Sequence, residues 1–329
     1  MLRPNSVGNL NMNLKIIDDS QKERVKYDPF MMIVDQTVRC NEACYFCWRA
    51  DKDKVKEQTK KAEGVMDMPF ELIKEIIDQG SRIPTIHTFN VCGPMGDPTV
   101  VEDMAQRGHY ARFMGFQRTM MNTNAVALDH HDPEDLLRAF NEIKVSLDTL
   151  DAENYKVIHG RNHLDRVLNN IVDYWQVKTT KGIEGNFKAK ITINEKNEHE
   201  IEDFRRWSEK TGVPIEWKRV HSFIDVMPEY GNEIGATLCE QPYKTININF
   251  KGELTTCCIN YKLDPVFGKV GVDGTIKEIW EGEYFEAWRK KRMNSICDGC
   301  AGLGGRLKSS ENLIPIYNDL GEEKFNERY

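Results

Sequence analysis

Three cysteines stand within eight residues of one another, as Cys40-Asn-Glu-Ala-Cys44-Tyr-Phe-Cys47. Thiolates at this spacing suit an iron–sulfur cluster or a zinc ion. A [4Fe-4S] cluster takes four cysteine ligands, so three would leave one iron open to a molecule other than the protein. Structural zinc sites pair a short CxxC with a second pair or with histidines, and a C-x3-C-x2-C loop is unusual for them. The triplet therefore favours a cluster, with zinc as the alternative.

An aromatic residue, Phe46, directly precedes the third cysteine. Here the chain resembles the radical S-adenosylmethionine (SAM) enzymes, whose signature is this triplet with an aromatic before the last cysteine. The resemblance implies a [4Fe-4S] cluster on Cys40, Cys44 and Cys47, whose open iron chelates the amino and carboxylate groups of SAM. It also implies that the reduced cluster cleaves SAM to a 5′-deoxyadenosyl radical, which takes a hydrogen atom from the substrate. The resemblance further implies an external electron donor such as flavodoxin or ferredoxin.

A second set of cysteines comprises Cys239, Cys257, Cys297 and Cys300, spaced x17, x39 and x2. Four thiolates brought together by a hairpin and a distal CxxC suffice to close a [4Fe-4S] cluster or a zinc site. The pattern resembles the twitch domain, the short form of the SPASM auxiliary-cluster extension of radical SAM enzymes, and so implies a second, auxiliary [4Fe-4S] cluster. Cys258 is surplus, and we interpret it as an alternate ligand, a buried thiol or a hydrogen-atom donor.

Several short segments resemble those that hold SAM in this family. Gly93-Pro-Met-Gly96-Asp97-Pro98 resembles the GGEP segment, with Asp97 in place of Glu; an ordinary Gly-Pro turn is the alternative. Asn122-Thr-Asn124 resembles TNG, and Ser146-Leu-Asp148 resembles S-L-D. Tyr155-Lys-Val-Ile-His159-Gly160 resembles the I-R-G that follows, with His159 in place of Arg. The cofactor contacts expected are Phe46, Gly96, Asp97, Pro98, Asn122, Asn124, Ser146, Asp148 and Lys190.

Lys190 is included because it alternates with apolar residues in Phe187–Ile193, together with Lys188 and Thr192. In a barrel, such a polar inward face marks a lumen that holds something charged; lysines facing water at an open edge are the alternative. In the sixth predicted strand, Glu216 and Lys218 point to one face, and Trp217, Arg219 and His221 to the other. We expect the face with Trp217 and Arg219 to meet substrate, with the Glu216 face as the alternative. Arg219 and Cys258 are the predicted catalytic residues, with Arg219 as a substrate contact or base.

The elements that must position these residues alternate between strand and helix from about Pro29 to Val220. Six strands joined by crossover helices predict a parallel α/β sheet. A doubly wound sheet fits this pattern, and the resemblance favours a partial (β/α)6 TIM-like barrel. After about Gly231 a β-hairpin and short helices predict a small α+β domain. The expected organisation is an N-terminal extension (1–28), the barrel (29–230), the twitch domain (231–306) and a tail (307–329). The predicted strands are Phe30–Asp35, Thr85–Val91, Arg118–Asn122, Glu142–Leu147, Phe187–Ile193 and Ile215–Val220.

The composition argues against a nucleic-acid-binding protein and against a membrane-spanning one. The net charge is −7, the sequence pI is about 5.7, and charges of both signs are mixed, unlike the basic face of a nucleic-acid binder. We interpret the densest charge run, Asp51 to Lys61, as a solvated loop. No apolar stretch approaches the roughly 20 residues of a membrane span, and the polar N-terminus does not resemble an export signal. Nine cysteines without such a signal favour a reducing cytoplasm and metal chemistry.

The leading functional hypothesis is a radical SAM enzyme that oxidises a hydroxyl-bearing small molecule by two electrons. It rests on the fully ligated auxiliary cluster, which has no open iron for substrate and so suits electron transfer, as in the resembling inosamine-alcohol dehydrogenases. Epimerisation or cross-linking of a peptide is the enzymatic alternative. A zinc-binding or redox-sensing protein is the non-enzymatic one.

Overall fold

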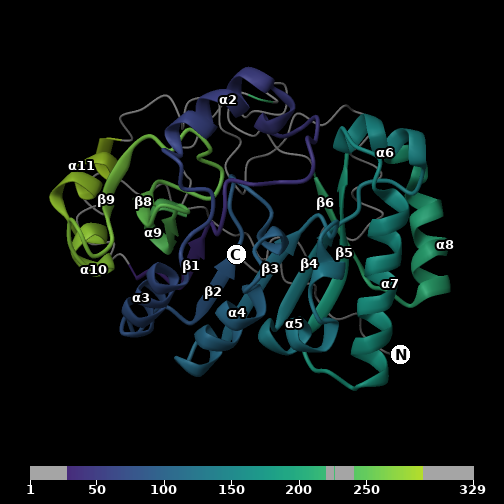
Figure 1. Cartoon of the computed structure of the whole chain (residues 1–329), viewed down its shortest axis with the longest axis horizontal. Coiled ribbons are helices and arrows are strands. Elements are labelled where there is room, and N and C mark those ends of the chain that lie inside the picture. The colour runs from purple at the N-terminus through teal and green to yellow at the C-terminus, as the bar shows by residue number, and fades with distance from the viewer. Residues whose placement is uncertain (1–27, 220–225, 227–240, 292–329) are drawn as a thin grey trace, which may run out of the picture.

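The computed structural model describes residues 28–219, 226 and 241–291 (Figure 1). In this part of the chain, parallel strands alternate with helices. The strands are β1 (Met31–Val34), β2 (Thr88–Val91), β3 (Arg118–Thr123), β4 (Glu142–Ser146), β5 (Asn186–Ile193) and β6 (Ile215–Arg219). The helices are α2 (Lys52–Lys61), α3 (Phe70–Ser81), α4 (Met104–Phe113), α5 (Pro133–Ala139), α6 (Ala152–His159), α7 (Leu164–Thr180) and α8 (Ile201–Thr211).

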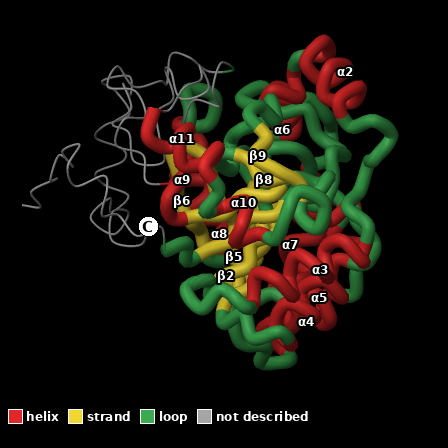
Figure 2. The backbone as a smooth tube through the Cα atoms, turned by 90° about the vertical axis from the view of Figure 1, so that its left-hand side faces the viewer, coloured by secondary structure: helices red, strands yellow, loops and turns green. Residues whose placement is uncertain are grey.

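All six strands pair in parallel, in the order β6-β5-β4-β3-β2-β1, so the predicted α/β barrel sheet is confirmed. Helices α3, α4 and α5 gather on one side of the strands (Figure 2). Strand β6 forms one edge of the sheet, which makes the barrel a partial one. No helix among the described residues is both long and apolar enough to span a membrane.

The run from Asp51 to Lys61 forms helix α2, so the interpretation of this segment as a solvated loop is wrong. The Asp51 carboxylate accepts hydrogen bonds from the backbone N–H groups of Asp53 and Lys54, which caps the helix. Lysine, glutamate and glutamine are good helix formers, and a polar helix needs no broad apolar face when it lies at the surface. The capping aspartate was the signal in the sequence that a dense charge pattern obscured.

The two faces of the sheet differ in chemistry because successive side chains of a strand point to opposite sides. The helix-facing side is apolar and belongs to the main core, with Met32, Phe89, Val145 and Ile191 as members. The opposite side, here called the inner face, carries a small apolar group of Met31, Ile33 and Met120. It also carries the polar and charged residues Asn90, Asn122, Glu142, Lys144, Ser146, Lys188, Lys190 and Glu216.

The C-terminal region continues the same sheet. After α9 (Gln241–Lys244), strand β7 (Thr245–Ile248) pairs in parallel with β1, and Met31 lies opposite Thr245. Strands β8 (Glu253–Thr255) and β9 (Val266–Lys269) follow in antiparallel order, which gives nine strands in the described sheet. The predicted hairpin is therefore present. Helices α10 (Ile276–Trp280) and α11 (Glu283–Lys291) lie beside it, at the end of the molecule opposite α7 and α8 (Figure 1).

Candidate active site

The loop from Cys40 to Cys47 follows β1 and lies against the last turn of α6. The backbone N–H of Ala43 donates to the carbonyl of His159 (2.9 Å), and that of Tyr45 donates to the carbonyl of Ile158 (2.9 Å). Gly160 closes α6 in the left-handed conformation (φ 69°), and a Cβ there would stand 2.7 Å from the Ala43 carbonyl oxygen. The cysteine loop therefore packs directly against the Ile158-His159-Gly160 end of α6.

The three cysteine thiols of this loop suit a cluster. Burial raises the pKa of Cys44 well above its usual value, and the neighbouring Cys47 and Cys40 raise it further, so the three sulfurs share one environment. Burial likewise raises the pKa of Cys40 to about 12, with the charge of Asp97 as the next cause. Binding iron removes that cost because a ligated thiolate shares its charge with the metal. No three metal-ligating side chains among the described residues converge as on a single ion, but each cubane ligand binds its own iron.

The glycines of the Gly93–Pro98 segment let it pack tightly against the cysteine loop. A Cβ on Gly96 would stand 2.3 Å from the carbonyl oxygen of Arg39 and 2.6 Å from that of Thr37. The backbone N–H of Asp97 donates to the same Arg39 carbonyl (2.9 Å). Both loops therefore meet at the carboxyl edge of the sheet, where ligands bind in barrel-like folds.

Two side chains directly after the triplet hold this segment from the other side. The indole N–H of Trp48 donates to the carbonyl of Pro94 (2.7 Å). The Arg49 guanidinium donates to the carbonyl of Met95 (3.0 Å) and also to that of Val38 (2.8 Å). These contacts were not foreseen from the sequence, although Trp48 and Arg49 adjoin Cys47 in it.

Asp97 is buried, and its carboxylate is occupied by donors of the protein. It accepts from the backbone N–H of Thr99 (3.0 Å), the hydroxyl of Thr123 (2.8 Å) and the backbone N–H of Asn124 (2.6 Å). Burial raises its pKa, and these hydrogen bonds work against that rise. The carboxylate thus joins the segment after β2 to the end of β3. A direct contact between this side chain and SAM stays a prediction.

Asn122 lies in β3 and Asn124 directly follows that strand, and the two side chains reach different partners. The amide of Asn124 donates to the side-chain oxygen of Asn41 (2.7 Å) and lies 3.5 Å from the Sγ of Cys40. Asn122 lies on the inner face and hydrogen-bonds Cys92, a thiol whose pKa is raised mainly by burial. Asn124 therefore lies beside Cys40, a predicted cluster ligand, and its contact with SAM stays a prediction.

Asp148 is almost fully buried, with a relative exposure of 1%. One oxygen accepts from the backbone N–H of Thr192 (2.6 Å). The other has no hydrogen-bond partner in the described part of the chain and lies 3.8 Å from the Nε2 of His159. Burial raises the pKa of Asp148 to about 6, partly offset by Thr192 and Lys190. Ser146 stands two residues earlier on the inner face, and Phe46 lies edge-on to Tyr45 with ring centroids 5.3 Å apart.

The charged residues of β4, β5 and β6 share the inner face, as the alternation in the fifth strand predicted. Lys144 lies 2.9 Å from carboxylate oxygens of both Glu142 and Glu216, and Lys188 lies 3.0 Å from Glu216. Lys190 lies two residues further along β5, nearer the cysteine loop. Burial raises the pKa of Asp148 and of Cys92, and the charge of Lys190 partly offsets both rises.

The choice of the Trp217 face as the substrate face is not supported for Trp217 itself. Its ring packs edge-on against Phe204 of α8, with centroids 5.9 Å apart, and belongs to the helix-facing core. Glu216, on the other side of β6, pairs in register with Lys190 and lies on the inner face instead. Arg219 ends β6, but its side chain lies outside the described residues, so its catalytic assignment stays a prediction.

Replacing Glu216 with glutamine is expected to destabilise the protein at neutral pH and much less in acid. Burial raises the pKa of Glu216, but Lys144 and Lys188 outweigh it and lower the pKa to about 2. A depressed carboxyl pKa stabilises the fold above the unfolded value near 4.5, by about 2–3 kcal/mol, and this is lost as the pH falls toward 2. Thermal unfolding at pH 7 and pH 3 measures the change.

The matched control for this prediction is Glu286→Gln, which removes an exposed ion pair with Lys290 on α11 and should barely change the melting temperature. A gap between wild type and Glu216→Gln that is as large at pH 3 as at pH 7 would contradict the assignment.

Asp35, directly after β1, is a site residue that the sequence motifs missed. It is buried, and burial raises its pKa to about 8. A Cβ on Gly93 would stand 1.6 Å from its Oδ1, so the Gly93–Pro98 segment lies directly over this carboxyl group. The signal was present in the sequence as an acidic residue that ends an apolar strand five residues before Cys40.

The second cysteine set is described only in part. Cys239, Cys297 and Cys300 lie outside the described residues, so their role as ligands stays a prediction. Cys257 and Cys258 follow β8, which runs from the carboxyl edge back toward the opposite edge. Cys258 packs against Met31, Ile33 and Met120 on the inner face. The loop then returns, and Tyr261 stacks on Trp48 with centroids 5.4 Å apart and planes 7° apart.

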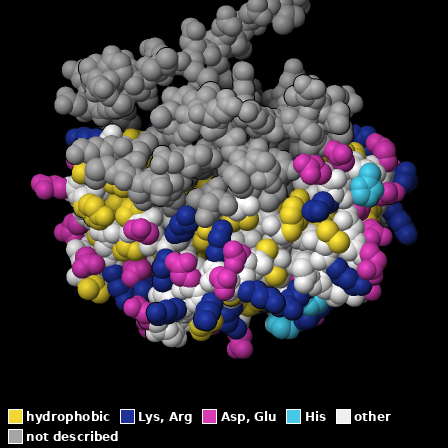
Figure 3. Space-filling model, turned by 90° about the horizontal axis from the view of Figure 1, so that it is seen from above, with side chains coloured by type: hydrophobic (Ala, Val, Ile, Leu, Met, Phe, Trp, Pro, Cys, Tyr) yellow, Lys and Arg dark blue, Asp and Glu magenta, His cyan; other side chains and the backbone are white. Residues whose placement is uncertain are grey.

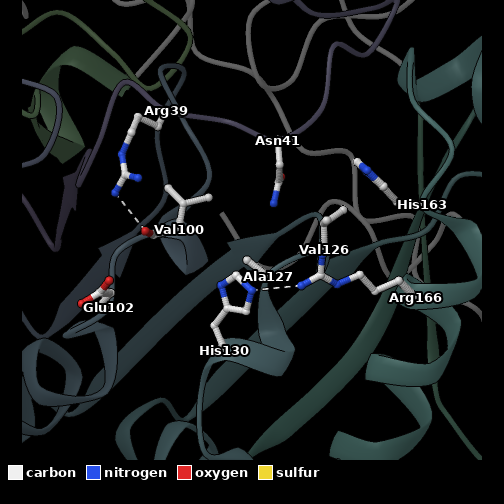
Figure 4. Close-up of a pocket in the computed structure, with 9 residues that line it drawn as sticks. All are labelled: Arg39, Asn41, Val100, Glu102, Val126, Ala127, His130, His163 and Arg166. Atoms are coloured by element: carbon white, nitrogen blue, oxygen red, sulfur yellow. Dashed lines mark hydrogen bonds between the residues drawn. The ribbon is translucent and has the colours of Figure 1, made fainter.

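A pocket of about 420 Å³ opens beside the cysteine loop (Figure 4). Arg39 and Asn41 border it from that loop, and Arg166 borders it from α7. Arg39 donates to the carbonyl of Val100 (2.9 Å), and Arg166 lies 3.0 Å from the Nε2 of His130. None of the predicted SAM contacts lines this pocket. In the view onto the carboxyl edge, Lys and Arg are interspersed with Asp and Glu over the visible described surface (Figure 3).

Comparison with known families gives two matches. Residues 35–207 match the family model described as the radical SAM superfamily, and residues 239–301 match an iron–sulfur cluster-binding domain, SPASM. A protein of Methanococcus maripaludis named probable GTP 3′,8-cyclase is 24% identical over 301 residues, covering 86% of this chain and 87% of that protein.

Two solved structures share the fold. Streptococcus suis SuiB bound to precursor peptide SuiA has a TM-score of 0.60 and 13% identity, covering 85% of this chain and 71% of that one. BtrN in complex with AdoMet and 2-DOIA has a TM-score of 0.53 and 13% identity, covering 84% of this chain and 94% of that one. At these identities the likeness concerns the fold alone.

Proposed function

Because the chain belongs to the radical SAM superfamily and carries an auxiliary-cluster domain, we propose that it oxidises a hydroxyl-bearing small molecule by two electrons. When bound, the first cluster and SAM supply a 5′-deoxyadenosyl radical that abstracts a hydrogen atom, and the auxiliary cluster supplies an electron acceptor. Cys40, Cys44 and Cys47 would hold the first cluster, and Cys239, Cys257, Cys297 and Cys300 the second. An external donor such as flavodoxin or ferredoxin completes the proposal.

The observation that carries this proposal is the position of the inner face near the two cysteine regions. The Cys40–Cys47 loop lies at the carboxyl edge, and Cys258 packs on the apolar floor formed by Met31, Ile33 and Met120. We infer that a substrate on the inner face would lie near both cysteine regions, although Cys257, the described member of the second set, itself packs against the main core. The stack of Trp48 on Tyr261 supports this, because it ties the loop after Cys47 to the loop after Cys257.

Charged groups on the inner face suit a polar substrate. Lys190 lies near the cysteine loop, and its positive charge partly offsets the rise that burial causes in the pKa of Asp148 and of Cys92. Oxidation of an alcohol also releases the hydroxyl proton, which needs an acceptor. We propose Asp35 for this step; burial raises its pKa to about 8, so the ionised form that accepts the proton grows as the pH rises toward 8. Arg219 remains the alternative from the sequence.

The test is replacement of Cys297 and Cys300 by alanine in the full chain. Anaerobic reactions would contain SAM, dithionite and a panel of amino alcohols, sugars and nucleotides including GTP. Mass spectrometry would follow 5′-deoxyadenosine and any product lighter by two hydrogens. We expect wild type to form the oxidised product over many turnovers, and the variant to form 5′-deoxyadenosine with product reduced at least about a hundredfold.

Two results would overturn the proposal. One is a variant with full multiple-turnover oxidation, since the auxiliary cluster would then not be the acceptor. The other is conversion of GTP by wild type without oxidation of any alcohol, which would favour the activity in the name of the Methanococcus maripaludis relative.

Radical epimerisation of a peptide is the second candidate, and the place of Cys258 on the inner face favours it. Epimerisation needs a thiol that returns a hydrogen atom to the substrate radical, and Cys258 packs beside Met31 and Ile33 on that face. Cys258→Ala separates the two candidates. Loss of product with 5′-deoxyadenosine retained supports epimerisation, whereas unchanged product supports dehydrogenation.

A further inference from the structure

His159 closes helix α6 and is buried against the cysteine loop, with a relative exposure of 1%. Its Nδ1 lies 3.3 Å from the Sγ of Cys44. Its ring stacks on Tyr155 with centroids 4.3 Å apart, and its carbonyl accepts from the N–H of Ala43. We propose that His159 is a positioning residue for the SAM-binding cluster. Its Nδ1 donates a hydrogen bond to Cys44, and this hydrogen bond raises the reduction potential of the cluster.

The direction of the hydrogen bond follows from the chemistry of the sulfur. A cysteine that ligates iron is a thiolate and has no proton to give, so it can only accept. An Nδ1 at 3.3 Å from this sulfur must therefore carry the proton, which fixes the tautomer of the ring. The buried ring cannot turn away easily, because Tyr155 covers one face and the backbone of His159 is itself bonded to the loop.

The effect on the cluster follows from charge. Reduction adds an electron to a cluster that is already rich in negative charge, and a hydrogen bond to a ligating sulfur stabilises that reduced form. Groups that hydrogen-bond to metal ligands orient those ligands and adjust the reduction potential of the metal site. His159 stands where the family motif has arginine, so this chain places a short donor against Cys44 at that position. The proposal concerns the first cluster alone and does not depend on the substrate.

The test uses two variants of His159 in the full, reconstituted protein. His159→Leu removes the donor, and His159→Asn keeps one, because the asparagine Nδ2 lies in the place of the imidazole Nδ1. The readout is the midpoint potential of the first cluster from an anaerobic redox titration followed by electron paramagnetic resonance, with the first cluster identified as the signal that changes when SAM is added. We expect a shift to more negative potential in His159→Leu and none in His159→Asn.

The matched control is His163→Leu. Its Nδ1 lies 3.0 Å from Glu42 and so supports the same loop without touching a cluster sulfur. We expect the wild-type potential in this variant. The proposal is overturned if His159→Leu keeps the wild-type potential, or if His159→Asn or His163→Leu shifts it as far. Should His159→Leu bind no cluster, iron bound by His159→Asn supports the donor role, and its absence there rejects it.

Discussion

Replacing Cys44 with alanine is expected to remove the first cluster and with it all SAM cleavage. If both sites hold cubane clusters, iron should fall from about eight atoms per chain to about four. Formation of 5′-deoxyadenosine should drop below detection, because no cluster remains to reduce SAM. Iron and sulfide analysis of anaerobically reconstituted protein, with chromatography of the reaction mixture, measures both effects.

The matched control is Cys92→Ala. Cys92 is a partly buried thiol that hydrogen-bonds Asn122 and belongs to neither cysteine set, so its loss should leave the iron content at the wild-type value. A Cys44→Ala protein that keeps all of its iron would contradict the ligand assignment. Equal losses of iron in the two variants would point to general instability instead.

Gly96→Ala is expected to separate the two loops that form the predicted SAM site. The added methyl group would stand 2.3 Å from the carbonyl oxygen of Arg39 and 2.6 Å from that of Thr37, both backbone atoms that cannot turn aside. Relief of this contact requires the loop to move and breaks the hydrogen bond from Asp97 to Arg39. Overpacking of this kind costs about 1–3 kcal/mol, so we expect SAM affinity to fall by between about fivefold and about 150-fold.

Equilibrium dialysis of labelled SAM against the reconstituted protein measures this affinity. Gly182→Ala is the control: a methyl group added at Gly182 would meet no atom within 4 Å, but the backbone there is in the left-handed region (φ 59°). The substitution should cost about 1–2 kcal/mol of folding stability and leave SAM affinity unchanged. SAM binding by Gly96→Ala at wild-type affinity would show that the Gly93–Pro98 segment does not depend on this close approach.

Much of the fold was legible in the sequence because its signals are local. Each of the six barrel strands was predicted as a short run, and the short helices predicted after Gly231 are present as α10 and α11. Strand β9 and helices α2 and α6 were not predicted. Helix α2 has almost no apolar face, and Val266–Lys269 is too short to show alternation, so tertiary pairing with β8 decides its state.

The sequence predicted which residues gather at the candidate site better than it predicted the contacts that each one makes. The resemblance singled out Asp97 by its place in a motif, but only the structure places the donors of Thr99, Thr123 and Asn124 around its carboxylate. Those donors come from the segment after β2 and from the end of β3, which are separated by more than twenty residues in the sequence. Trp217 was assigned to the wrong face because strand alternation alone does not tell which side the helices cover. The packing of Phe204 decides it.

The pairing of β1 with both β2 and β7 has a consequence for how the chain unfolds. A strand with a neighbour on each side cannot leave the sheet without breaking two ladders of hydrogen bonds. The strand that leads to Cys40 therefore cannot open independently of the strands that lead to Cys257. In the language of hydrogen exchange, the two cysteine regions belong to one cooperative unit, with β1 among its most protected segments. If the strands that lead to one cysteine region unfold, we therefore expect the other cysteine region to lose its structure as well.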